Sequence, residues 1–169
     1  LRQTSETLLR ATDALGVKPD GLLPALERLT ESEKKLRKEL EAAKTKNFGA
    51  KSGDLIRGAR TVKGVRVVSA RVPDADRAAM RRLVDGLRPK LPSGVIVLGA
   101  TGEGKVNLVT AVSRDLTDRL DAGKIARKVA DIVDGKGGGR KDLAEAGGRL
   151  PEKLDESIDA VYGIVERML

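Results

Sequence analysis

The chain has 169 residues, a formal net charge of +8 and a pI near 9.9, with aromatic residues at only 1%. It contains no cysteine and no histidine. These absences exclude disulfides, thiolate- or histidine-ligated zinc, and hydrolysis by Ser–His–Asp or Cys–His arrangements. The basic excess favours a polyanionic partner such as nucleic acid, and its alternative is a solvated surface rich in arginine and lysine.

The N-terminal part, residues 1–50, has the apolar spacing of two helices. The first stripe ends at Gly16, a typical helix stop, and consists of Thr4, Leu8, Ala11 and Leu15. A second helix to about residue 46 has leucines that alternate at spacings of four and three, with Glu33 at a core position. This seam predicts a helical hairpin with the first helix or a coiled coil with a second chain, through Leu22, Leu26, Leu29, Leu36 and Leu40.

The composition changes after the second helix. Residues 47–53 have the glycine and serine content of a linker, which separates residues 1–50 from a globular part at 54–169. The globular part has β-branched runs at 65–72 and 95–100 and at the residues after Lys105, and the last two of these predict a hairpin. Helical stripes follow Pro73 and Asp121 and end the chain at 154–168. Strands interleaved with helices indicate an α/β (α+β) domain, with a mixed sheet flanked by helices.

The segment 134–149 combines glycines with basic residues, and it is the motif that most clearly suggests a binding site. Three consecutive glycines leave the backbone bare, and basic side chains bracket them, so N–H groups and cations would meet a phosphate together. We predict a Gly-rich loop here, followed by a short helical turn at 143–146. The alternative is that the glycines serve close packing. The candidate RNA-binding residues are Lys136, Gly137, Gly138, Gly139, Arg140, Lys141, Gly147 and Gly148.

Several of these residues match the sequence pattern of a known family. The run from Gly135 to Arg140, the glycines at 147–148 and the segment 106–123 resemble the C-terminal domain of alanyl-tRNA synthetases, and so does the helix at 17–40. Asp134 and Glu145 stand where that family often has glycine and glutamine. The resemblance implies a non-catalytic module without a cofactor that helps to hold alanine-specific tRNA for aminoacylation and editing. Its other partners would be the aminoacylation and editing domains of the same polypeptide, and a second copy in a homodimer.

The resemblance also implies a cytoplasmic protein. No apolar run approaches the roughly 20 residues that span a bilayer, so no membrane partner is expected. The chain begins with Leu1 inside a helical pattern, and we expect it to be a fragment of a longer protein.

Three alternatives stay open. The globular part also resembles the associated domain of DHH phosphoesterases, in which a histidine commonly follows the three glycines. Arg140 occupies that place here. The second alternative is a purely structural role in dimerisation or domain bridging, which would use the leucine seam. The third is that the positive charge of the chain binds DNA. Because aromatic stacking platforms are lacking, we expect recognition of folded RNA by phosphate and 2′-hydroxyl contacts, with strong salt dependence.

Overall fold

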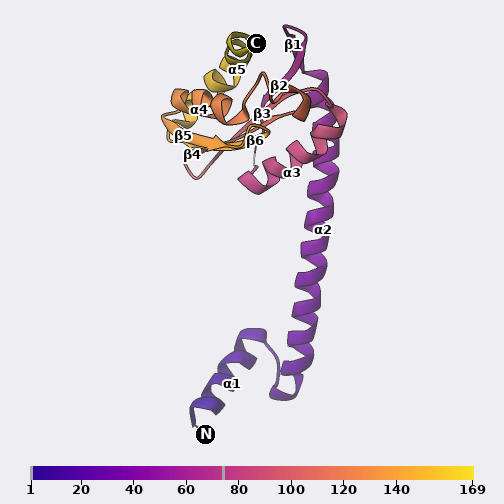
Figure 1. Cartoon of the computed structure of the whole chain (residues 1–169). Coiled ribbons are helices and arrows are strands. Elements are labelled where there is room, and N and C mark those ends of the chain that lie inside the picture. The colour runs from indigo at the N-terminus through magenta and orange to yellow at the C-terminus, as the bar shows by residue number, and fades with distance from the viewer. Residues whose placement is uncertain (1, 74) are drawn as a thin grey trace. The chain divides into compact units, whose positions relative to one another are not determined.

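The chain forms two compact units, Leu1–Asn47 and Phe48–Leu169, in a computed structural model (Figure 1). The structure describes residues 2–73 and 75–169, and it describes side chains in these ranges except at 2–5, 41 and 44–51. The predicted domain limits, 1–50 and 54–169, stay a prediction.

The first unit is helical. Helix α1 (Arg2–Leu15) ends at Gly16, which has φ +64° and so takes the left-handed conformation that glycine adopts at low cost. The N–H of Val17 then bonds to the Thr12 carbonyl at 3.0 Å. A short 3₁₀ turn, η1 (Pro19–Gly21), leads into helix α2 (Leu22–Arg57).

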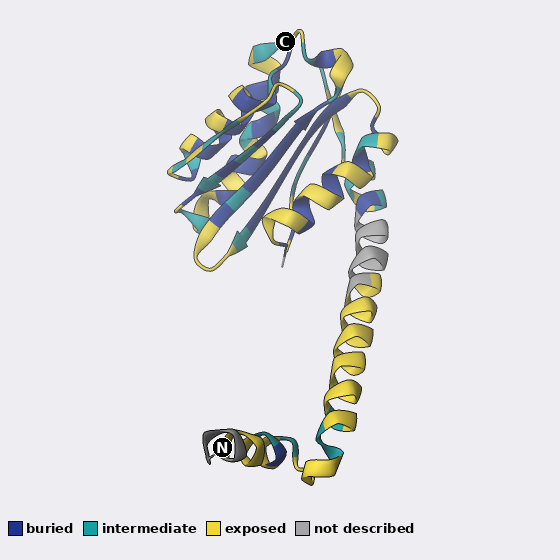
Figure 2. Ribbon diagram, turned by 60° about the horizontal axis from the view of Figure 1, so that its bottom comes forward, coloured by how far each residue is buried: buried dark blue, intermediate teal, exposed yellow. Residues whose placement is uncertain are grey.

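The leucine seam of α2 is open to solvent. Most of the described residues of α2 in the first unit are exposed (Figure 2). Leu26, Leu29, Leu36 and Leu40 are between 43% and 64% exposed. Leu8, which belongs to the predicted stripe of helix α1, is exposed as well. The predicted hairpin that buries the seam is therefore wrong for these four leucines, whereas the coiled coil with a second chain stays a prediction.

The predicted linker at 47–53 is wrong, because these residues belong to helix α2. Residues 47–51 lie outside the described side chains. Tertiary contacts overcome the low helix propensity of this stretch. Leu55 and Ile56 pack against the apolar core beside α3, and the Lys90 ammonium donates to Ser52 Oγ at 2.6 Å.

The second unit contains a six-stranded sheet in the order β1-β2-β3-β4-β6-β5. Strands β2 and β3 are parallel and every other neighbouring pair is antiparallel. The predicted mixed sheet and the predicted hairpin are thus confirmed. The strands are β1 (Arg60–Val62), β2 (Val65–Arg71), β3 (Gly94–Gly102), β4 (Lys105–Val112), β5 (Gly135–Gly139) and β6 (Leu143–Gly148).

Helices cover both faces of the sheet. Helices α4 (Ala122–Ile132) and α5 (Leu154–Met168) pack on one face, and α3 (Arg77–Leu87) packs on the other. Successive side chains of a strand point to opposite faces, so Val95 and Val97 enter the core beneath α4 and α5, whereas Ile96 enters the core beneath α3. Three short 3₁₀ turns connect these elements: η2 (Arg88–Lys90), η3 (Arg114–Leu116) and η4 (Pro151–Lys153).

Aspartates cap two of the helices. Asp121 Oδ1 accepts a hydrogen bond from the N–H of Lys124 at 3.1 Å, which confirms its predicted place at the start of α4. Asp76 does the same for α3 through the N–H of Ala79 at 2.6 Å. The predicted opening of this helix at Pro73–Asp74 is too early, and Asp74 itself lies outside the described residues.

Candidate nucleic-acid interface

The predicted Gly-rich loop is an edge strand, β5, and the predicted helical turn at 143–146 is part of β6. Close packing explains both errors. A Cβ on Gly137 would overlap Ala146 of β6, and a Cβ on Gly139 would lie 2.5 Å from the Cα of Ala144. A Cβ on Gly148 would lie 2.5 Å from the Val133 carbonyl oxygen. The alternative that these glycines serve close packing therefore holds at these positions.

Gly138 and Gly147 differ from their neighbours. A Cβ on Gly138 would find no atom nearer than the Arg127 guanidinium at 3.8 Å. A Cβ on Gly147 would lie 3.3 Å from the Val106 carbonyl oxygen and 3.7 Å from the Arg77 guanidinium. Here the absence of a side chain leaves the backbone bare beside cationic groups, as a phosphate or ribose contact requires.

The structure divides the predicted site residues between the two ends of β5. Lys136, Gly147 and Gly148 line a surface depression of about 510 Å³. We call it the Lys136 depression, and its other lining residues include Arg77, Lys105, Asn107, Asp134 and Arg149. Arg140 and Lys141 instead lie in the turn from β5 to β6. At a rise of about 3.3 Å per residue, some 13 Å of strand separate Lys136 from Arg140.

The turn residues have structural partners. Arg140 is 75% exposed in its side chain, and its Nε lies 3.2 Å from Asp142 Oδ1. The N–H of Arg140 donates to the Leu143 carbonyl at 2.8 Å, and the Lys141 carbonyl accepts from the N–H of Ala122 at 2.9 Å. The backbone of this turn is thus held in place, and its two cationic side chains project beside it.

Sequence reasoning missed the arginines that α3 and η2 place along β6. Arg77 donates to Asn107 Oδ1 of β4 at 3.1 Å, Arg81 donates to Glu145 Oε1 at 3.2 Å, and Arg88 donates to the Asp142 carbonyl at 3.0 Å. Their spacing of four and seven residues is the signal that the sequence carries, because it places them on one helix face. The spacing does not show that this face lies beside the glycine strands. That face adjoins the buried stripe of α3, which consists of Met80, Leu83, Val84 and Leu87.

Cations predominate around the Lys136 depression. Two carboxylates moderate this charge. Glu145, 29% exposed in its side chain, lies 3.2 Å from Arg81 and 3.9 Å from Arg77. Asp134 accepts from Arg149 at 2.8 Å. With Lys105 and Lys136, five cations face two carboxylates among the described residues here, which gives a local excess of positive charge suited to a polyanion.

No group of three or more Asp or Glu side chains in the described part of the chain is arranged to hold a metal ion. Among the described helices, none has the length and apolar character that crossing a membrane requires.

The fold and the sequence now identify the class of domain. The family model of the DHHA1 domain matches residues 64–167. The chain therefore belongs to the DHHA1 domain family.

Curated relatives of the chain are alanine–tRNA ligases. The chain is 44% identical over 168 residues to the alanine–tRNA ligase of Solibacter usitatus and 41% identical to that of Chromohalobacter salexigens. In both cases the match covers 99% of this chain and 19% of the relative, so the chain spans about a fifth of the relatives' length. These relatives favour the synthetase over the phosphoesterase, and they confirm the resemblance predicted from the Gly-rich segment.

A solved structure agrees with the curated relatives. The C-Ala domain of the Aquifex aeolicus alanyl-tRNA synthetase superposes with a TM-score of 0.60 at 28% identity, over 64% of this chain and 97% of that one. The chain is homologous to this non-catalytic region, which confirms the prediction that it performs no catalysis of its own.

Proposed function

We propose that this chain is the tRNA-binding C-terminal module of an alanyl-tRNA synthetase, and that the Lys136 depression and the α3 arginines contact the sugar–phosphate backbone. One observation carries the proposal. Cations from several elements converge beside the bare backbone of Gly147. Arg77 lies at the start of α3, Lys105 at the start of β4, Lys136 in β5, and Arg149 directly after β6.

This arrangement suits a duplex backbone better than single strands. Arginine presents a planar fork that matches two phosphate oxygens, and a bare glycine lets a ribose or phosphate approach the main chain. Single-strand binding commonly uses stacked aromatic rings. The second unit's Tyr162 ring instead lies under the Arg60 guanidinium, 4.6 Å from centroid to Cζ. We therefore propose recognition of folded RNA through phosphates and 2′-hydroxyls.

The proposed partners follow from the relatives. The module would hold alanine-specific tRNA while the aminoacylation and editing domains of the same polypeptide act on it, and the protein would be cytoplasmic. The module itself would need no cofactor. Binding by one domain adds to binding by the others through effective concentration, so a modest affinity of the isolated chain is compatible with this role.

A second function, self-association, is supported by the exposure of the α2 seam. Leu29 is 56% exposed and Leu36 is 64% exposed. Leucines repeated at spacings of three and four on one helix form the contact surface of coiled coils. We propose that the seam pairs with a second copy, independently of RNA binding.

Fluorescence anisotropy of labelled tRNA, titrated with the 169-residue chain over a salt series, tests the main proposal. The variants Arg77→Ala and Lys136→Ala should each weaken binding by roughly three- to tenfold, because each removes one phosphate contact. Arg167→Ala is the control, since Arg167 is exposed on α5 at the opposite face of the sheet. Equal affinities for all three variants would refute the proposed interface.

A further inference from the structure

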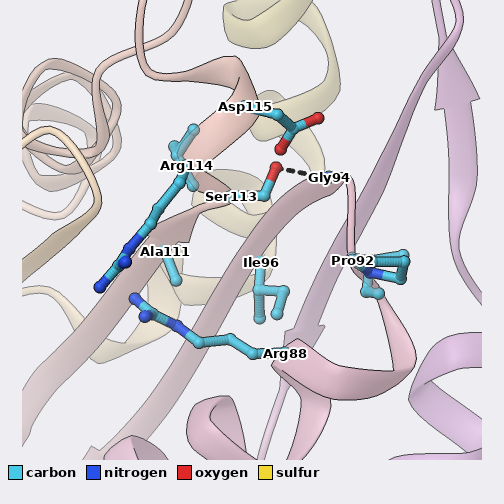
Figure 3. A pocket seen from close by; sticks show the side chains of 10 residues that line it. Arg88, Pro92, Gly94, Ile96, Ala111, Ser113, Arg114 and Asp115 are labelled. Atoms are coloured by element: carbon cyan, nitrogen blue, oxygen red, sulfur yellow. Dashed lines mark hydrogen bonds between the residues drawn. The ribbon is translucent and has the colours of Figure 1, made fainter.

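A second depression lies where η2, the start of β3 and the residues after β4 meet (Figure 3). Its volume is about 510 Å³, and it shares no lining residue with the Lys136 depression. We call it the Arg114 pocket. Its floor is apolar and consists of Leu91, Pro92, Ile96 and Ala111.

Two guanidinium groups converge over this floor. Figure 3 shows the side chains of Arg88 and Arg114 pointing toward one another, with Ile96 and Ala111 beside them. The Arg88 guanidinium donates one N–H to the Asp142 carbonyl at 3.0 Å, which leaves four N–H groups for a ligand. The Arg114 guanidinium has no hydrogen bond or ion pair to any described residue. Two like charges that face each other in this way create a site for an anion with several acceptor oxygens.

The loop that carries Arg114 is held rigidly. Ser113 Oγ accepts from the N–H of Gly94 at 2.9 Å, and the N–H of Ser113 donates back to the Gly94 carbonyl at 3.0 Å. Ser93 Oγ donates to Asp115 Oδ2 at 2.6 Å. Because β3 and the loop are fastened together in this way, the pocket exists before any ligand arrives, which reduces the entropic cost of binding.

The opposite end of the pocket carries an acceptor. Hydrogen bonds from the side chains of Ser113 and then Ser93 hold the pKa of Asp115 below its ordinary value, so this group is a carboxylate at neutral pH. In Figure 3 the Asp115 carboxylate lies beyond Ser113, away from the two guanidinium groups. A ligand would therefore meet cations at one end, an apolar surface in the middle and an acceptor for N–H or O–H groups at the other end.

We propose that the Arg114 pocket binds a single nucleotide unit, with its phosphate between Arg88 and Arg114 and its base against the apolar floor. A free mononucleotide and an unpaired nucleotide of an RNA chain offer the same chemistry. Inorganic phosphate alone would leave the apolar floor uncovered. This goes beyond the proposed function, because the pocket is separate from the Lys136 depression and its occupancy does not require bound tRNA.

The test is a titration of the ¹⁵N-labelled 169-residue chain, followed through the amide signals of Ser113, Arg114 and Asp115. The probes are AMP and UMP, adenosine, inorganic phosphate, a single-stranded RNA pentamer, and a blunt RNA duplex that offers no unpaired nucleotide. Arg114→Ala removes a side chain that no described residue holds, so the fold should survive. It should weaken nucleotide binding at least about tenfold, by loss of one charge-assisted contact. Arg119→Ala, an exposed arginine five residues further along the chain, is the matched control.

Saturable shifts with AMP or UMP, weaker with phosphate and with adenosine, would establish a site for free nucleotides. Shifts with the pentamer alone would establish a site for an unpaired nucleotide within RNA. Equal binding of phosphate and AMP, no shift with any nucleotide probe, or unchanged binding in Arg114→Ala would overturn the proposal. Each of these results is independent of tRNA binding at Arg77 and Lys136.

Discussion

Replacing Glu145 with glutamine should strengthen RNA binding. The Glu145 carboxylate lies 3.2 Å from the Arg81 guanidinium and 3.9 Å from that of Arg77, in the row of arginines along β6. It occupies the place that a phosphate would take between the same two cations. Glutamine preserves the size and the acceptor oxygen of the side chain and removes the charge, so both guanidinium groups become available to RNA.

The magnitude follows from charge and exposure. Two unit charges about 4 Å apart interact by about 1 kcal/mol in water and more strongly at lower dielectric. Glu145 is 29% exposed in its side chain, so solvent screens much of its repulsion toward a phosphate. We expect a gain of about 1 kcal/mol in binding, which corresponds to about a fivefold lower Kd. Since one more cation is free to neutralise a phosphate, the slope of log K against log salt should steepen by about 0.7–0.9.

The assay is the tRNA anisotropy titration at four or more salt concentrations, with thermal unfolding of each variant in parallel. Asp155→Asn is the control. Asp155 on α5 is also paired with an arginine, Arg71, at 3.4 Å. Its substitution should leave tRNA affinity within twofold of the parent chain. An unchanged or higher Kd for a folded Glu145→Gln variant would refute the claim that phosphates lie against Arg77 and Arg81.

Three further predictions concern stability and assembly. Gly137→Ala should lower the free energy of unfolding by about 1–3 kcal/mol in chemical denaturation, because its Cβ would overlap Ala146. The control variant Gly138→Ala should change the free energy of unfolding by less than about 0.5 kcal/mol. Equal costs for the two variants would contradict the assigned packing. Thr110→Val should raise stability by about 1 kcal/mol, since Thr110 Oγ1 is buried with no hydrogen-bond partner among the described residues, and a loss of stability would mean that the hydroxyl has a partner. The double variant Leu29→Ser/Leu36→Ser should abolish concentration-dependent sedimentation; a parent chain that remains monomeric at high concentration would contradict a role of the seam in self-association.

Much of the second unit could be predicted because its local patterns and its tertiary contacts agree. The uninterrupted apolar run from Val95 to Ala100 predicts a strand buried on both faces, and helices indeed cover both faces of the sheet. Asp121 predicts the start of α4 because a carboxylate before an amphipathic stripe satisfies free N–H groups.

The glycine segment could not be predicted from composition. Glycines at 135–139 are typical of a loop, and their strand conformation depends on β6, whose Ala144 and Ala146 leave room only for glycine opposite them. The same register separates Lys136 from Arg140 along the strand, so residues that are adjacent in the motif lie at two ends of the surface. The helical conformation of Gly53 could not be predicted for the same reason, since contacts of Leu55 and Ile56 with a distant part of the chain stabilise its helix.

The candidate site was found only in part for a related reason. Lys136 and Gly147 were identified from the motif, but Arg77 and Arg81 lie some 60 residues earlier and join them only through the packing of α3 beside β6. A helix face of basic residues is usually a solvated surface. What distinguishes these two arginines is their proximity to the glycine strands, and this follows from the strand order rather than from any local pattern.

The most direct test of the tRNA-binding interface is the double variant Arg77→Ala/Lys136→Ala, compared with Arg167→Ala, in tRNA anisotropy across a salt series. Loss of two phosphate contacts should weaken binding about ten- to a hundredfold and reduce the magnitude of the slope of log K against log salt by about 1.5–2, whereas Arg167→Ala should match the parent chain. An unchanged slope and affinity in the double variant would contradict the assignment of the Lys136 depression as the place where this chain holds RNA.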